Sequence, residues 1–136
     1  MIVSMHVASG AAAGAALGSR RGALAAGVLL HVVCDMVPHQ DIPSRRFEIR
    51  SGLALLALIA AARGPLDPAV VGAVTSSAPD LEHVLRLPRP GGRKLFPTHR
   101  FARLHRTGGV RASLQLVAAG AIVGAAISRR PVLEHR

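Results

Sequence analysis

Four side chains that often bind metal ions fall close together in this sequence: His31, Asp35, His39 and Asp41. His31 and Asp35 are four residues apart, so on a helix they share one face and can bind one metal ion or hydrogen-bond each other. Both lie in an apolar run, where an ionisable side chain is costly unless it is paired or functional. Imidazole and carboxylate groups together suit zinc, manganese or iron. The pattern predicts a metal site, and the alternative is a His–Asp pair that only holds helices together.

A second cluster of ligand-type side chains follows Pro79. Asp80 and His83 are three residues apart and lie near one face if a helix begins there. Asp80 also has the position of a helix N-cap, with Glu82 favoured in the first turn. The two roles are compatible, because a capping side chain can bind a metal ion when the start of its helix faces the site.

The last two candidates, His99 and His105, lie in a strongly basic segment with no acidic residue from His83 to Pro131. Such a segment is typical of a solvated or lipid-facing surface. The alternative is a phosphate-binding rim, in which arginine side chains bind phosphoryl oxygens and one histidine completes the metal shell or acts as a general acid.

Five apolar runs must position these side chains. Alternation with a period of two is absent and Ala and Leu dominate, so each run is predicted to be a helix. Asp67 and Pro68 are expected to begin the fourth helix, Pro38 to end the second, and Gly64 to end the third. The runs are Ile2 to Gly18, Gly22 to Val37, Leu53 to Ala62, Val70 to Ala78 and Ala112 to Ser128.

Alternating helix directions would bring the candidates to one end of the molecule. The start of the first helix, the loop after the second and the segment after the fourth then lie together, which adds His6 to the group. We expect one or two divalent ions, most readily zinc, at this end. The predicted ligands are His31, Asp35, His39, Asp80, His83, His6, His99 and His105.

The composition favours a membrane setting. Half of the residues are hydrophobic, but only three are aromatic, all Phe, so the apolar content comes from the small residues and Leu that let helices approach closely in lipid. The net charge of +10 comes from arginines that flank the apolar runs, which suits anionic lipid headgroups, and no nucleic-acid motif is present. The only cysteine, Cys34, has no disulfide partner.

These features predict one all-α domain over residues 1–136, a compact bundle of about five short membrane-embedded helices with a basic loop at 82–111. The end that carries the candidates has more basic residues, so it is expected to face the cytoplasm of an inner or plasma membrane. Gly and Ala on the first and last helices would permit self-association into a homo-oligomer.

The motifs resemble those of the inner-membrane-bound, metal-dependent hydrolases, small helical proteins with a Pro-Asp-x-Asp-His element and later histidine motifs. Pro79, Asp80, Glu82 and His83 match the first element, with Glu82 in place of the second aspartate. The order of Thr98, His99, Arg100, His105 and Arg106 differs from the family's later motif. The His31-x-x-x-Asp35 spacing is also distantly similar to that of zinc-dependent phospholipase C. The resemblance implies a helical fold and hydrolysis of phosphoesters or lipids.

Three functions are consistent with these residues. The first is a membrane-bound metal-dependent hydrolase of a phosphoester or phospholipid-like substrate, in which Glu82 or Asp41 takes the proton from water and loop arginines hold the phosphate. The second is a non-catalytic membrane scaffold or partner subunit with structural His/Asp pairs. The third, haem bound by two histidines, leaves the carboxylates without a role.

Overall fold

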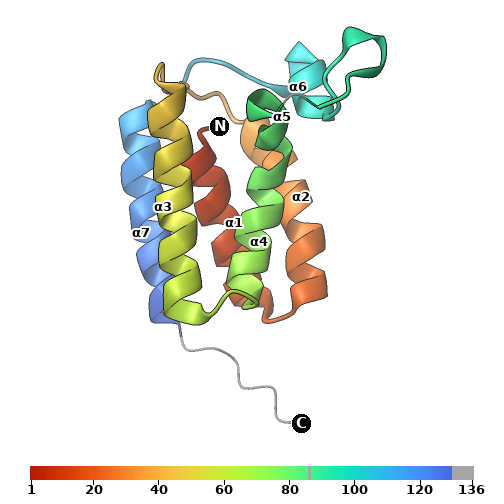
Figure 1. Ribbon diagram of the computed structural model, residues 1–136. Coiled ribbons are helices and arrows are strands. Elements are labelled where there is room, and N and C mark those ends of the chain that lie inside the picture. The colour runs from red at the N-terminus through yellow and green to blue at the C-terminus, as the bar shows by residue number, and fades with distance from the viewer. Residues whose placement is uncertain (86, 130–136) are drawn as a thin grey trace.

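The computed structural model describes residues 1–85 and 87–129, and over these residues the chain is α-helical without β-strands. The all-α prediction is confirmed, and each of the apolar runs lies in or largely within a helix. The long helices run up and down side by side (Figure 1). They are α1 (Val3–Leu17), α2 (Arg20–Met36), α3 (Arg45–Arg63), α4 (Pro68–Ser77) and α7 (Ala112–Ser128).

Local signals place most of the helix ends. The Asp67 carboxylate caps α4 by accepting a hydrogen bond of 2.8 Å from the Ala69 amide, and Pro68 occupies the first helical position, as the sequence predicts. Gly64, with a φ of 91°, ends α3. This helix begins at Arg45, well before the predicted apolar run, because the Ser44 hydroxyl caps the amide of Phe47.

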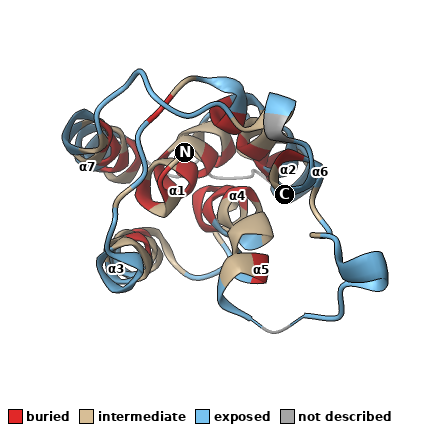
Figure 2. Cartoon of the chain, turned by 90° about the horizontal axis from the view of Figure 1, so that it is seen from above, coloured by how far each residue is buried: buried red, intermediate tan, exposed pale blue. Residues whose placement is uncertain are grey.

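The bundle is organised around α1, which packs against α2, α3, α4 and α7 (Figure 2). Its contact with α4 depends on glycine: a Cβ atom on Gly10 would lie 2.2 Å from the carbonyl oxygen of Gly72, and a Cβ atom on Gly72 would lie 2.2 Å from that of Gly10. The buried side chains here are also small, such as Ala8, Ala11 and Ala73. The small residues of the sequence therefore bring α1 and α4 into close backbone contact.

The prediction of membrane-embedded helices, with a site facing the cytoplasm, is wrong. Among the described residues no helix combines the length and the apolar character that crossing a bilayer demands. A crossing takes about 20 apolar residues, whereas α2 and α7 have 17 each and α1 has 15. Helix α3 has 19 residues, but charged residues occupy both of its ends and shorten its apolar part. These are Arg45, Arg46, Glu48, Arg50 and Arg63.

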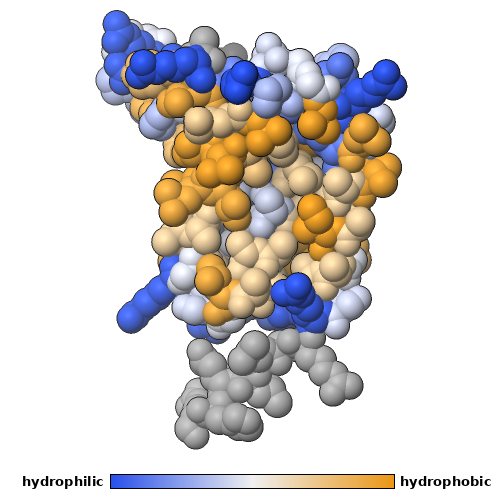
Figure 3. Space-filling view, turned by 180° about the vertical axis from the view of Figure 1, so that it is seen from behind, coloured by the Kyte–Doolittle hydropathy of each residue, from blue (hydrophilic) through white to orange (hydrophobic). Residues whose placement is uncertain are grey.

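Many large apolar side chains are nevertheless exposed on the outer helix faces, and polar residues cover both ends of the bundle (Figure 3). On α2, Leu29 is 66% exposed, and on α7, Val117 is 71% exposed.

The segment predicted as a basic loop at 82–111 contains short helices and lies across one end of the bundle (Figure 1). Backbone hydrogen bonds attach it to the chain after α2, with the Gln40 amide donating to Val110 and the Val110 amide to Pro38, both at 2.9 Å. We call this end, where α1 begins and α2 and α4 finish, the site end. The short helices of this segment are α5 (Leu81–Val84), η2 (Pro90–Gly92), α6 (Pro97–Arg100) and η3 (Ala102–Leu104), and η1 (Ala78–Asp80) comes directly before them.

Candidate metal centre

The structure gathers all the predicted ligands at the site end, although they come from different parts of the chain. Three of the histidines, His6, His31 and His39, have no exposed surface, and Asp35 is only 1% exposed. Helix α1 supplies His6, and α2 supplies His31 and Asp35. His39 follows α2, Asp80 and His83 lie on η1 and α5, His99 lies on α6, and His105 follows η3.

Asp35 lies at the centre of this cluster. Its Oδ2 atom is 3.2 Å from Nε2 of His31, 3.5 Å from Nδ1 of His105 and 3.7 Å from Nε2 of His99. Its Oδ1 atom accepts a hydrogen bond of 2.6 Å from the amino group of Met1 and lies 3.2 Å from Nε2 of His6. Burial raises the pKa of Asp35, but the imidazoles, led by that of His105, outweigh burial and hold the pKa well below its usual range. Asp35 is therefore a carboxylate.

Carbonyl groups fix the tautomer of two of the histidines. Nδ1 of His31 donates to the carbonyl oxygen of Ser76 at 2.8 Å, and Nδ1 of His39 donates to that of Val37 at 2.7 Å. A carbonyl oxygen only accepts hydrogen bonds, so the proton of each neutral ring is on Nδ1. Both Nε2 atoms are left with a lone pair directed into the cluster, which is the arrangement of metal-binding histidines.

Glu82 fixes the tautomer of His99 in the same way, by accepting a hydrogen bond from its Nδ1 atom. Its carboxylate accepts a short hydrogen bond from Nδ1 of His99 and a hydrogen bond of 2.6 Å from the amide of Leu95. Burial raises the pKa of Glu82, but these hydrogen-bond donors lower it by more. The net pKa is below its ordinary value, so the group is ionised. Glu82 thereby orients His99 with Nε2 toward Asp35 and Asp80.

The result is a set of acceptor atoms that face one another. Nε2 of His31 and Nε2 of His99 are only 3.3 Å apart, and Nε2 of His99 is 3.4 Å from Oδ1 of Asp80. Ligand atoms of His31, Asp35 and His99 lie within 4.8 Å of one another, and Asp80 belongs to overlapping sets with His6 and His31 and with His83 and His99. Lone pairs at these distances repel unless a cation lies between them. We call His31, Asp35, Asp80 and His99 the inner group.

An outer group shares Asp35 with the inner group. Asp35, His39 and His105 offer ligand atoms within 4.8 Å of one another. Asp41, which is 53% exposed, places Oδ1 at 3.3 Å from Nε2 of His39 and Oδ2 at 3.9 Å from Nε2 of His105. The carboxylates of Asp35 and Asp41 raise the pKa of His105 to about 9. In turn, the imidazoles of His105 and His39, led by that of His105, hold the pKa of Asp41 well below its usual range.

Several buried polar atoms at the site end have no hydrogen-bond partner among the described residues. Unpaired buried polar atoms are rare, since each costs about 1–3 kcal/mol. A bound cation or its water ligands would satisfy atoms of this kind. They are Nδ1 of His6, Oδ2 of Asp35, Nε2 of His39, Oδ2 of Asp80, Oγ of Ser76 and Oγ1 of Thr98.

Asp80 and His83 form the edge of the cluster. The Asp80 side chain makes no capping hydrogen bond to the amides of α5, and its Oδ2 atom instead lies 3.9 Å from Nε2 of His6. His83 accepts a hydrogen bond of 3.3 Å from Nζ of Lys94. Burial, reinforced by the charge of Lys94, lowers the pKa of His83 to about 4, so this ring is neutral.

Sequence reasoning missed Gln115, which holds the site end together. This side chain on α7 is 2% exposed. Its oxygen accepts a hydrogen bond of 3.2 Å from the amide of Ile2, and its Nε2 donates to the carbonyl groups of Gln40 at 2.8 Å and Val110 at 3.0 Å. The signal was a single amide side chain in an otherwise apolar run.

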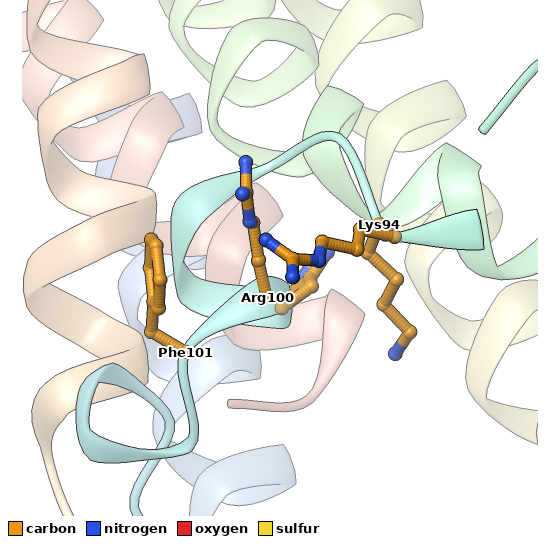
Figure 4. A pocket seen from close by; sticks show the side chains of 5 residues that line it. Lys94, Arg100 and Phe101 are labelled. Carbon is orange, nitrogen blue, oxygen red and sulfur yellow. The ribbon is translucent and has the colours of Figure 1, made fainter. Parts of the chain in front are cut away.

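A cavity of about 470 Å³ opens beside the inner group. Figure 4 shows its basic side chains on the segment that leads into and out of α6, with Phe101 alongside α2. The lining residues are Arg93, Lys94, His99, Arg100 and Phe101.

Comparison of the chain with models of protein families, with curated proteins and with solved structures gives no match. The resemblance to the metal-dependent hydrolases therefore stays a prediction.

Proposed function

We propose that this protein is a metal-dependent hydrolase that binds one or two zinc ions at the site end and cleaves a phosphoester. The observation that carries the proposal is the approach of the His31 and His99 Nε2 atoms to 3.3 Å, with both Nδ1 protons engaged elsewhere. Two imidazole lone pairs beside two carboxylates form a donor set that zinc prefers.

Each group has a distinct part in the proposal. The inner group supplies two imidazoles and the carboxylates of Asp35 and Asp80 to a first ion. The outer group supplies His39 and His105 to a second ion, and Asp35 contributes to both because its carboxylate borders both groups. His6 and His83 lie at the border of the inner group and complete or orient its ligands.

A zinc ion held there would lower the pKa of a coordinated water to about 7 and polarise a phosphoryl oxygen. Asp41 is the candidate base, because its carboxylate is exposed and lies 3.3 Å from Nε2 of His39 in the outer group. We assign Glu82 a positioning role, since its oxygens are occupied by backbone amides and by His99.

The choice of a phosphoester rests on charge and on the sequence resemblance. The chain carries a net charge of +10, and three basic side chains line the cavity beside His99. Guanidinium groups pair well with phosphoryl oxygens, so an anionic substrate would be drawn to this end of the molecule.

Metal analysis of the purified full-length protein tests the proposal. We expect at least one zinc ion per chain, together with hydrolysis of a chromogenic aryl phosphate that EDTA abolishes and added zinc restores. Absence of zinc, manganese and iron, with no metal-dependent phosphoesterase activity, would contradict the proposal.

The scaffold alternative predicts a different result. If the histidines and carboxylates only satisfy one another, a protonated imidazole takes the place of the ion. His31→Ala and Asp35→Ala would then lower the free energy of unfolding without removing any metal, and EDTA would not change the melting temperature of the wild-type protein.

A further inference from the structure

The cavity beside the inner group is strongly basic. Of its five lining residues, Arg93, Lys94 and Arg100 carry positive charge and none is acidic. His99 belongs both to this lining and to the inner group. A molecule in the cavity can therefore reach a residue of the candidate metal centre.

In the described part of the chain, no carboxylate forms an ion pair with the arginine and lysine side chains of the cavity. Over residues 1–85 and 87–129, Arg63 with Asp67 is the only ion pair formed by an arginine or lysine side chain. The nearest carboxylate in the sequence, Glu82, is occupied by the Leu95 amide and His99. The Arg100 guanidinium lies 5.2 Å from the centre of the Phe101 ring, a contact that orients the arginine and leaves its charge available.

The arrangement of donors favours one kind of anion. A guanidinium group binds two oxygens side by side, and Arg93 and Arg100 both line this cavity. A phosphomonoester has three terminal oxygens and, above its second pKa of about 6, close to two negative charges. A phosphodiester has two terminal oxygens and one charge, so it offers the arginines and the metal centre fewer acceptor atoms and less negative charge than a monoester.

On the basis of the proposed function, we infer that this cavity is the site of the substrate phosphate and selects phosphomonoesters over phosphodiesters. Arg93 and Arg100 are the specificity-determining residues, and Lys94 adds a third charge. Phe101 forms an apolar wall against which the organic group of the ester lies.

Calorimetric titration of the full-length protein with methyl phosphate and dimethyl phosphate tests this inference. The titrations are run on the protein as purified and again after EDTA treatment, above the second pKa of the monoester. We expect methyl phosphate to bind about tenfold more tightly than dimethyl phosphate, because one charge-assisted contact contributes about a factor of ten. The preference should persist after EDTA treatment, since the cationic side chains do not depend on the metal.

Variants that each remove one positive charge test whether methyl phosphate binds in this cavity. Arg93→Gln and Arg100→Gln each should weaken methyl phosphate binding about tenfold, and both residues are exposed, so the variants are expected to fold. Arg21→Gln removes the same charge from the start of α2, at the opposite end of the bundle, and should leave the affinity unchanged (Figure 1). Circular dichroism of each variant checks the fold.

Equal affinity for the two esters, or methyl phosphate binding that Arg93→Gln and Arg100→Gln do not change, would overturn the inference. The two proposals fail separately. Monoester selectivity in a protein that never binds metal contradicts the hydrolase proposal alone, whereas metal binding without monoester selectivity contradicts the phosphate site alone.

Discussion

Two regions of this molecule use charged side chains in opposite ways. At the end of the bundle opposite the site end, where α3 and α7 finish and α4 begins, Arg63 donates to Asp67 at 2.9 Å and to the carbonyl groups of Ala126 and Arg129. Asp67 also accepts from the Ala69 amide. At the site end, acceptor atoms lie close together instead: the carboxylate oxygens of Asp35 and Asp80 and the Nε2 atoms of three histidines. Several of these buried atoms have no hydrogen-bond donor in the described part of the chain.

The difference separates a structural ion pair from a binding site in the same chain. Arg63 and Asp67 are almost fully buried, with 4% and 6% of their side chains exposed, and their donors and acceptors match. Such a pair needs no bound ion to satisfy its charges. At the site end, the Met1 amino group and His105 supply positive charge to Asp35, but Oδ2 of Asp80 and Nε2 of His39 are buried without a partner among the described residues, which is the condition that a bound cation relieves.

The largest effect is expected from Asp35→Asn. Both groups share this carboxylate, so the variant should lose its bound metal completely, as measured by elemental analysis. Asp67→Asn is the matched control: it removes the same charge from the Arg63 pair and should lower the free energy of unfolding by about 3 kcal/mol while the metal content stays unchanged. A full complement of metal in Asp35→Asn would remove the distinction between the two regions.

The body of the bundle should respond most to Gly72→Ala. The added Cβ would lie 2.2 Å from the Gly10 carbonyl oxygen, a backbone atom that no rotamer change can move. We expect a loss of about 3 kcal/mol in urea unfolding, with metal still bound by the folded fraction.

Gly120→Ala on α7 is the control for this substitution, because a Cβ there meets nothing within 4 Å. It should stabilise the protein by about 0.5–1 kcal/mol, since alanine favours a helix over glycine. Equal effects of the two substitutions would mean that close contact of α1 with α4 does not set the stability of the body.

A smaller effect is expected from Glu82→Gln. The carboxylate holds the proton of His99 on Nδ1, and a neutral amide would hold it less firmly. Metal affinity, measured by competition with a chelator, should fall about 10–100-fold without loss of the fold. Glu48→Gln on α3, another partly buried carboxylate that accepts from a backbone amide, should leave the affinity unchanged. Equal affinities of the two variants would argue against a positioning role for Glu82.

The smallest effect concerns pH. The pKa of His105 is raised to about 9 in the folded protein, from an ordinary value of 6.5. Its contribution to stability is therefore fully present below about pH 6.5 and is lost as the pH rises through 9. In EDTA, the free energy of unfolding of the wild-type protein should fall over this window, relative to His105→Gln, by on the order of 1 kcal/mol, after allowance for screening by solvent. Parallel pH profiles would contradict the pairing of His105 with Asp35.

Much of the fold could be predicted from short stretches of sequence. Asp67 and Pro68 begin α4 and Gly64 ends α3 because capping and backbone preferences act within a few residues. The start of α3 was missed because Ser44 and the charged residues after it form a helix without an apolar pattern. The membrane prediction failed because composition does not determine helix length: α1, α2 and α7 have 15 to 17 residues, fewer than a bilayer crossing takes.

The sequence by itself determined which chemical groups the chain offers and that its segments are helical, since side-chain identity and helix propensity are local properties. Tertiary structure alone decided the tautomers of His31 and His99, because the partners of their Nδ1 atoms, on Ser76 and Glu82, lie far from them in the chain. It also decided the role of Gln115, which joins segments that meet only when α7 packs against α1. Distances between side chains depend on how the helices pack, so they cannot be read from the spacing of residues along the chain.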